Sequence, residues 1–94
     1  MLTKCDFNGY MMAMTHISNP IAPIRCNDGF SMSVQASSMH YCHPRSDQGP
    51  WSSFEVWGSD NALLPYVEKN SEVCGFVPLD VVVTIINNHG GMAK

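Results

Sequence analysis

The chain has 94 residues, of which 45% are hydrophobic and only 14% charged, and its net charge is −3. A chain of this length supports one hydrophobic core, so we expect a single domain over residues 1–94. The composition excludes an intrinsically disordered protein, and the scattered basic residues argue against direct nucleic-acid binding, which requires clustered positive charge.

The first expected element is a β-hairpin formed by residues 2–7 and 10–16. Asn8 and Gly9 lie between these segments, and an Asn-Gly pair is preferred in type I′ turns because both central residues need a positive φ. Prolines then interrupt regular structure, so residues 18–29 are predicted to be a connection that ends in an Asn-Asp-Gly turn.

Two antiparallel strands are expected in the middle of the chain. The clearer one covers residues 30–36, where apolar and polar side chains alternate with the period of two that is typical of a half-buried strand. A second strand is predicted around Phe54 and Val56. Residues 43–50 contain two prolines and a glycine, so they form the loop that connects the strands.

A short helical turn and another strand follow. The polar residues 59–61 offer a helix N-cap, but Pro65 limits the element after them to a turn or a short distorted helix. Residues 71–77 are predicted to be a strand, with Cys74 and Phe76 on one face and the remaining apolar side chains on the other.

Residues 78–89 carry opposing signals and are predicted to be a helix. The run of β-branched side chains favours a strand by propensity. However, a proline precedes the segment, two glycines follow it, and apolar residues recur at the helical spacing i, i+3, i+4 and i+7: Leu79, Val82, Val83 and Ile86. The predicted fold class is therefore α+β, a small antiparallel sheet with a C-terminal helix packed on one face.

Residues 37–57 form the segment best suited to recognition, because they combine turn-forming residues with aromatic rings and an arginine. Tyrosine, tryptophan and arginine dominate the binding energy of protein interfaces. We expect one tryptophan to lie in the core and the other to be partly exposed beside Arg45. The residues predicted to bind a partner protein are Tyr41, Arg45, Asp47, Trp51, Glu55 and Trp57.

Other kinds of site compete with this interpretation. His40, His43 and Arg45 are suited to binding a small anion, which would make the protein a small-ligand or nucleotide-sequestering module. His40, Cys42 and His43 carry metal-ligating atoms, but the spacings of structural zinc sites are missing, so no metal or cofactor is expected. Because neighbouring residues on a strand point to opposite faces, His43 is poorly placed to activate Cys42. We predict no catalytic residue and no enzyme activity.

The N-terminal sequence favours a cytosolic protein. Asp6, Asn8 and Gly9 interrupt the segment where a signal peptide needs an apolar core, and no apolar stretch has the length of a membrane span. We therefore expect no membrane association. The reducing cytosol favours free thiols, so the four cysteines are expected to be unpaired. The sequence is also compatible with a homo-oligomer.

Several motifs between residues 32 and 91 follow one another in the order SVQAS, HYC, PR, GP and EV, then LLPYVE and GFVPLDVVVTIINNHGG. In this order they resemble a family of small proteins encoded by tailed bacteriophages and prophages. The resemblance implies a virus-encoded accessory protein that acts in the host cytoplasm. We interpret it as an anti-defence protein, such as an anti-CRISPR protein, that inhibits a host defence complex such as a CRISPR–Cas effector by direct binding. The first 30 residues match no pattern of this family.

Overall fold

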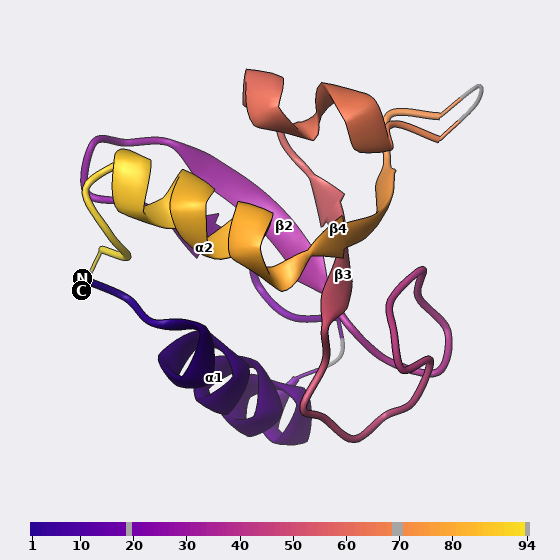
Figure 1. Ribbon diagram of the computed structural model, residues 1–94. Coiled ribbons are helices and arrows are strands. Elements are labelled where there is room, and N and C mark those ends of the chain that lie inside the picture. Colours follow the sequence, from indigo (N-terminus) through magenta and orange to yellow (C-terminus); the bar gives the residue numbers. More distant parts are fainter. Residues whose placement is uncertain (19, 69–70, 94) are drawn as a thin grey trace.

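The computed structural model describes residues 1–18, 20–68 and 71–93. It contains a four-stranded antiparallel sheet in the order β1-β2-β3-β4, with helices on one face (Figure 1). The elements are α1 (Lys4–Ile17), β1 (Ile24–Arg25), β2 (Ser31–Gln35), β3 (Ser53–Trp57), the 3-10 helix η1 (Asn61–Tyr66), β4 (Cys74–Pro78) and α2 (Leu79–Asn88). The predicted α+β class, with an antiparallel sheet and a C-terminal helix, is confirmed.

The central strand pair has the predicted arrangement. β2 and β3 are antiparallel, with Val34 opposite Val56, and both side chains are fully buried. The expected connection over residues 18–29 contains one strand that we did not predict, because Ile24 pairs with Met32 in β2. Residue 19 of that connection lies outside the described part of the chain. The connection ends in the predicted turn, where Gly29 has a φ of 95°.

The predicted N-terminal hairpin is wrong, because residues 4–17 form the helix α1. Thr3 caps this helix: its hydroxyl accepts a hydrogen bond from the Asp6 amide at 3.1 Å, and the Asp6 carboxylate accepts one from the Thr3 amide at 3.2 Å. The helix buries Phe7, whose ring packs edge-on against Phe54 at 5.3 Å. Capping and core burial therefore outweigh the local turn preference of Asn8-Gly9.

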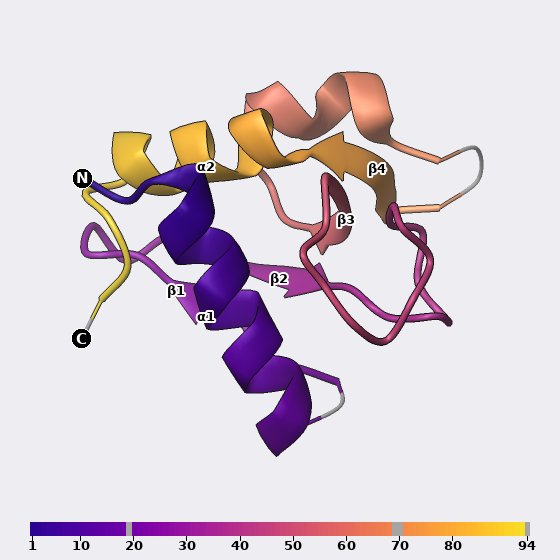
Figure 2. The same ribbon diagram turned by 60° about the horizontal axis from the view of Figure 1, so that its bottom comes forward.

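The predicted C-terminal helix is confirmed as α2, which lies between α1 and η1 in both ribbon views (Figures 1 and 2). Its β-branched side chains would suit a strand, but as a helix they form one continuous apolar face against the sheet. The fully or nearly buried residues of this face are Val82, Val83, Ile85 and Ile86. Each contributes about 1.5–3 kcal/mol through burial before conformational entropy is counted, which outweighs a strand propensity of about 1 kcal/mol.

The edge strand β4 departs from the predicted alternation because it contains a β-bulge. Phe54 pairs with Val77 and Val56 pairs with Cys74, so one residue of β3 faces two residues of β4. As a result Cys74 and Val77 both enter the core, whereas Phe76 points to solvent. The expectation that Cys74 and Phe76 share one face is therefore wrong.

Three side-chain amides hold irregular segments against regular elements. Each amide accepts from the backbone N–H and donates to the backbone C=O of one residue, as a neighbouring strand would. Asn8 binds Trp51 in this way at 2.8 and 2.9 Å, Gln35 binds Ile21 at 2.9 and 2.7 Å, and Asn87 binds Leu2 at 3.0 and 3.0 Å. Asn8 and Gln35 are buried, so these bonds are shielded from competition by water.

His89, just after α2, contacts two further segments, the turn at residues 28–30 and the start of η1. Its Nδ1 lies 2.6 Å from a carboxylate oxygen of Asp28, its Nε2 lies 2.8 Å from one of Asp60, and its ring stacks on Phe30 at 4.0 Å. Hydrogen bonds from Asp60 and then Asp28 raise the pKa of His89. Backbone N–H groups, followed by the His89 ring, lower the pKa values of Asp28 and Asp60.

These shifts predict a pH dependence of stability. The raised pKa of His89 stabilises the fold fully below the ordinary histidine value of 6.5, and this contribution is lost as the pH rises through the raised value. The lowered carboxyl pKa values stabilise the fold above about 3.8, and that contribution is lost as the pH falls through the lowered values. The free energy of unfolding should therefore decline as the pH rises above 6.5 and through the raised pKa of His89.

Urea unfolding across this pH range tests the expectation. His89→Gln should flatten the decline, whereas His16→Gln, at an exposed position of α1, should leave it unchanged. An equal slope in the parent and in His89→Gln would show that the two ion pairs do not contribute to stability.

A second prediction concerns the buried amide of Asn8. Asn8→Asp keeps the shape of the side chain but removes the donor to the Trp51 carbonyl and places a carboxylate against that oxygen. We expect the free energy of unfolding to fall by about 2–3 kcal/mol, because a buried acceptor is left unsatisfied beside a charge. Gln48→Glu is the control, at an exposed position in the loop that leads to Trp51. It should change the free energy of unfolding, measured in urea, by less than about 0.5 kcal/mol.

Candidate functional site

Four exposed side chains around the 37–52 loop and the bulge of β4 form what we call the aromatic face: Tyr41, Arg45, Trp57 and Phe76. The three aromatic side chains are 44%, 54% and 48% exposed, respectively, although burial of such rings is strongly favoured. Trp57 lies two residues after Glu55 on β3, and Glu55 accepts a hydrogen bond from the Tyr41 amide at 3.4 Å. The loop and the outer face of β3 are therefore joined at this contact.

An arginine and two aromatic rings lie next to one another on this face, and we call this group the stack, with the two rings tilted by 31° to each other. The guanidinium carbon of Arg45 lies 5.4 Å from the centre of the Tyr41 ring, and the Tyr41 ring lies 6.0 Å from the Phe76 ring. The Phe76 amide donates to the Tyr41 carbonyl at 3.0 Å, which fixes the loop against β4. The stack is thus assembled from a loop and a strand more than 30 residues apart in sequence.

The backbone of Phe76 is strained. Its φ is 54°, and it is the one non-glycine residue with a positive φ in the described part of the chain. A Cβ at the preceding Gly75 would displace the flexible end of the Glu68 side chain and approach the Cβ of Tyr41 to 3.3 Å, so the bulge packs closely against the loop. A large apolar side chain that is held outward by a strained backbone is typical of functional positions. Sequence reasoning missed Phe76. The local signal that could have indicated the bulge is Gly75, because a glycine inside a strand often marks one.

Trp51, which we predicted to bind a partner, is in fact part of the core. It is 1% exposed, and its indole N–H donates to the Ser46 carbonyl at 3.1 Å. The two tryptophans do divide into one buried and one exposed residue. However, Arg45 stacks on Tyr41 and not on a tryptophan.

The two predicted acidic residues make contacts within the molecule. The Asp47 carboxylate accepts hydrogen bonds from the backbone and hydroxyl of Ser38 at 2.9 and 3.0 Å, which lower the pKa of Asp47. Glu55 is only partly exposed and joins Tyr41 and His40 to β3, with 3.8 Å between its carboxylate and the His40 ring. Asp47 and Glu55 therefore hold the loop in place, and they could contact a partner only at the edge of the aromatic face.

Of the residues weighed as metal ligands or anion contacts, His40 and Cys42 are hydrogen-bonded within the loop. His40 Nδ1 lies 2.6 Å from the Ser37 hydroxyl, and the Cys42 thiol donates to the Ser37 carbonyl at 3.2 Å. Burial raises the pKa of Cys42, so its thiol stays protonated and unreactive at neutral pH. The side chain of His43 is exposed. Among the residues that the structure describes, no three His, Cys, Asp or Glu side chains are arranged to hold a metal ion.

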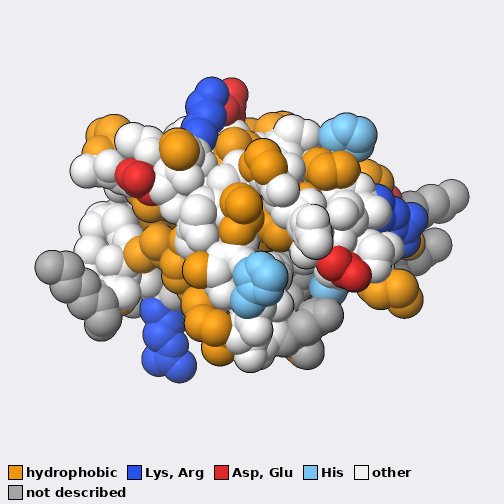
Figure 3. Space-filling model, turned by 90° about the horizontal axis from the view of Figure 1, so that it is seen from below, with side chains coloured by type: hydrophobic (Ala, Val, Ile, Leu, Met, Phe, Trp, Pro, Cys, Tyr) orange, Lys and Arg blue, Asp and Glu red, His pale blue; other side chains and the backbone are white. Residues whose placement is uncertain are grey.

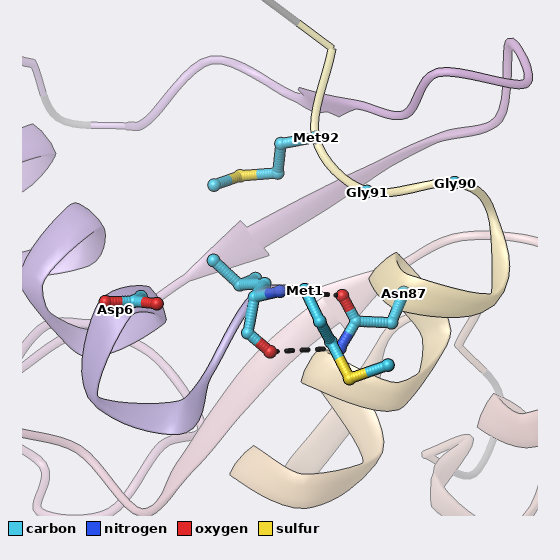
Figure 4. Close-up of a pocket in the computed structure, with 7 residues that line it drawn as sticks. Met1, Asp6, Asn87, Gly90, Gly91 and Met92 are labelled. Atoms are coloured by element: carbon cyan, nitrogen blue, oxygen red, sulfur yellow. Dashed lines mark hydrogen bonds between the residues drawn. The ribbon is translucent and has the colours of Figure 1, made fainter.

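A cavity of about 660 Å³ lies where the N-terminus meets the end of α2 (Figure 4). Its walls are formed by Met1, Leu2, Asp6, Asn87, Gly90, Gly91 and Met92. The polar side chains there already have partners: the Asn87 amide binds the backbone of Leu2, and the Asp6 carboxylate accepts from the Thr3 amide. The cavity is therefore large enough for a small ligand, but its polar side chains are not directed at one.

Hydrophobic side chains are also spread over the α1 side of the molecule, with charged residues mainly at its edge (Figure 3). Met12 and Ile17 are 39% and 76% exposed on this helix. Exposed apolar side chains of this kind are common on protein surfaces, and here neither a strained backbone nor a stacked cation accompanies them. We assign them no role.

Comparison with known proteins identifies no relative: no protein-family model, no curated protein and no solved structure matches this chain. Over residues 1–18, 20–68 and 71–93, no helix is long and apolar enough to cross a membrane.

The strain at Phe76 leads to a prediction about stability. Phe76→Gly removes the cost of a left-handed backbone and loses little buried area, so the free energy of unfolding should stay within about 1 kcal/mol of the parent or rise. Phe54→Ala changes a fully buried ring and should lower it by about 3–5 kcal/mol. Urea unfolding of both variants makes the comparison. A loss of more than about 2 kcal/mol in Phe76→Gly would mean that this ring serves the core.

Proposed function

We propose that this protein binds another protein through the aromatic face, and that it is a phage-encoded inhibitor of a host defence complex such as a CRISPR–Cas effector. The observation that carries the binding proposal is the exposed stack of Arg45, Tyr41 and Phe76, held outward by a strained backbone. The partner class is supported by the resemblance of residues 32–91 to small phage proteins.

The composition of the aromatic face suits a protein interface. Tyrosine, tryptophan and arginine supply most interfacial binding energy, and truncating one such anchor commonly costs 2 kcal/mol or more. The rings of Tyr41 and Phe76 are positioned in advance by the hydrogen bond between their backbones, so little conformational entropy is lost on binding. The serines and Asp47 of the 37–52 loop provide the polar rim that surrounds such anchors.

The proposed mechanism is occlusion of a partner surface without catalysis. The protonated, buried thiol of Cys42 and the engaged ring of His40 support a binding function over a nucleophilic one. The four cysteines are free, which agrees with an action in the reducing host cytoplasm. We do not extend the proposal to nucleotide sequestration, because Arg45 lies over Tyr41 and His40 is hydrogen-bonded to Ser37.

The test compares binding by the parent chain and by variants of the stack. Affinity purification from a bacterial host with the parent and with Phe76→Gly as bait identifies proteins retained only by the parent. The purified partner is then titrated with each chain in calorimetry. Tyr41→Ala and Phe76→Gly should each weaken binding about 30-fold, which corresponds to about 2 kcal/mol. Leu64→Ala, at an apolar position of η1 that is 67% exposed, should have no effect.

The inhibitory role has its own readout. Expression of the parent chain in a host with an active defence complex should restore phage plaques, and Phe76→Gly should not. A partner that is unrelated to defence would leave the binding proposal intact and reject the inhibitory one. Binding that survives both stack substitutions would reject the aromatic face as the interface.

A further inference from the structure

A second cavity, of about 320 Å³, lies beside Trp57 on the outer face of the sheet. Its walls combine an aromatic ring, a carboxylate, two hydroxyl-bearing residues and a glycine: Trp57, Glu72, Ser31, Ser59 and Gly58. The indole N–H of Trp57 donates to one oxygen of Glu72 at 3.4 Å, which holds the carboxylate at the edge of the ring. The cavity therefore presents a π face and a negative charge side by side.

This combination of groups has a definite ligand preference. The indole ring is the strongest aromatic partner of a cation, and a carboxylate beside it adds a charge-assisted hydrogen bond. In the described part of the chain, no lysine or arginine forms an ion pair with Glu72 and no cation lies over Trp57. The serine hydroxyls at positions 31 and 59 are acceptors suited to further N–H groups of a guanidinium.

We propose that this cavity receives an arginine or lysine side chain of the partner protein, with its charged end over the Trp57 ring and paired with Glu72. The inference rests on the proposed function, because Trp57 belongs to the aromatic face. The net charge of −3 supports a basic partner surface by long-range attraction. An apolar or acidic side chain in the same place would leave the Glu72 carboxylate desolvated without a counter-charge.

Nuclear magnetic resonance on the isotope-labelled 94-residue chain tests this site directly. The probe is a glycine-serine peptide with three spaced arginines, and the matched probe carries neutral citrulline at the same positions. The arginine peptide should shift the indole N–H signal of Trp57. The corresponding signal of Trp51, which is buried and bonded to Ser46, is an internal control that should not move.

Substitutions at Glu72 and Trp57 test whether these two side chains bind the peptide, as opposed to the net negative charge of the whole protein. Glu72→Gln should weaken binding of the arginine peptide about tenfold, and Trp57→Leu should abolish the saturable shifts of the backbone signals of Ser31 and Gly58. Asp80→Asn is the matched control, because it removes the same charge on α2, where Asp80 pairs with Lys4 at 2.6 Å. It should change the affinity less than twofold.

Several outcomes would overturn the inference. A site for a partner's basic side chain would be rejected if the citrulline peptide bound as tightly as the arginine peptide, or if Glu72→Gln and Asp80→Asn had equal effects. It would also be rejected if free arginine or spermine bound as tightly as the peptide. If the partner complex is lost on Phe76→Gly but unchanged on Glu72→Gln, this inference fails and the proposed function stands. If the arginine peptide binds at Trp57 but the partner binds Phe76→Gly as tightly as the parent, the cation site stands and the proposed interface at the stack fails.

Discussion

Paired hydrogen bonds between side-chain amides and the backbone hold the irregular half of this small protein in place. The Asn8 amide fixes Trp51 from α1, and Gln35 fixes Ile21 from β2, in each case through both the N–H and the C=O of the held residue. With the 37–52 loop anchored at Trp51, the remainder of the loop is free to present Tyr41 and Arg45 outward. A loop with so few regular hydrogen bonds would otherwise lose entropy on binding a partner.

The β-bulge in β4 places an exposed aromatic ring beside this ordered loop. Because Cys74 and Val77 both enter the core, the extra residue of the bulge must project outward, and here that residue is Phe76. The left-handed backbone costs stability of the order of 1–2 kcal/mol, which the hydrophobic core offsets. The fold therefore keeps an exposed ring beside Tyr41 that stability alone would not retain.

The two ends of the aromatic face have opposite charge. Arg45 covers the stack at one end, whereas Glu72 lies beside Trp57 at the other. A surface with a positive and a negative end orients a partner as it approaches and rejects partners with the reverse arrangement. Such a surface suits the proposed binding function, in which affinity comes from complementary shape and charge.

Local sequence signals were sufficient for β2, β3, the turn at Gly29 and α2, because alternation, turn residues and helical spacing act over a few neighbouring residues. The same reasoning predicted Tyr41 and Arg45 at the surface and one exposed tryptophan without deciding which, and the Thr3 to Asp6 capping box would have indicated α1. The burial of Trp51 and the exposure of Phe76 were decided only by the tertiary structure. The first depends on an amide 43 residues away. The second depends on a register shift between strands: Gly75 hints at a bulge, but the pairing of β4 with β3 decides which side chain turns outward.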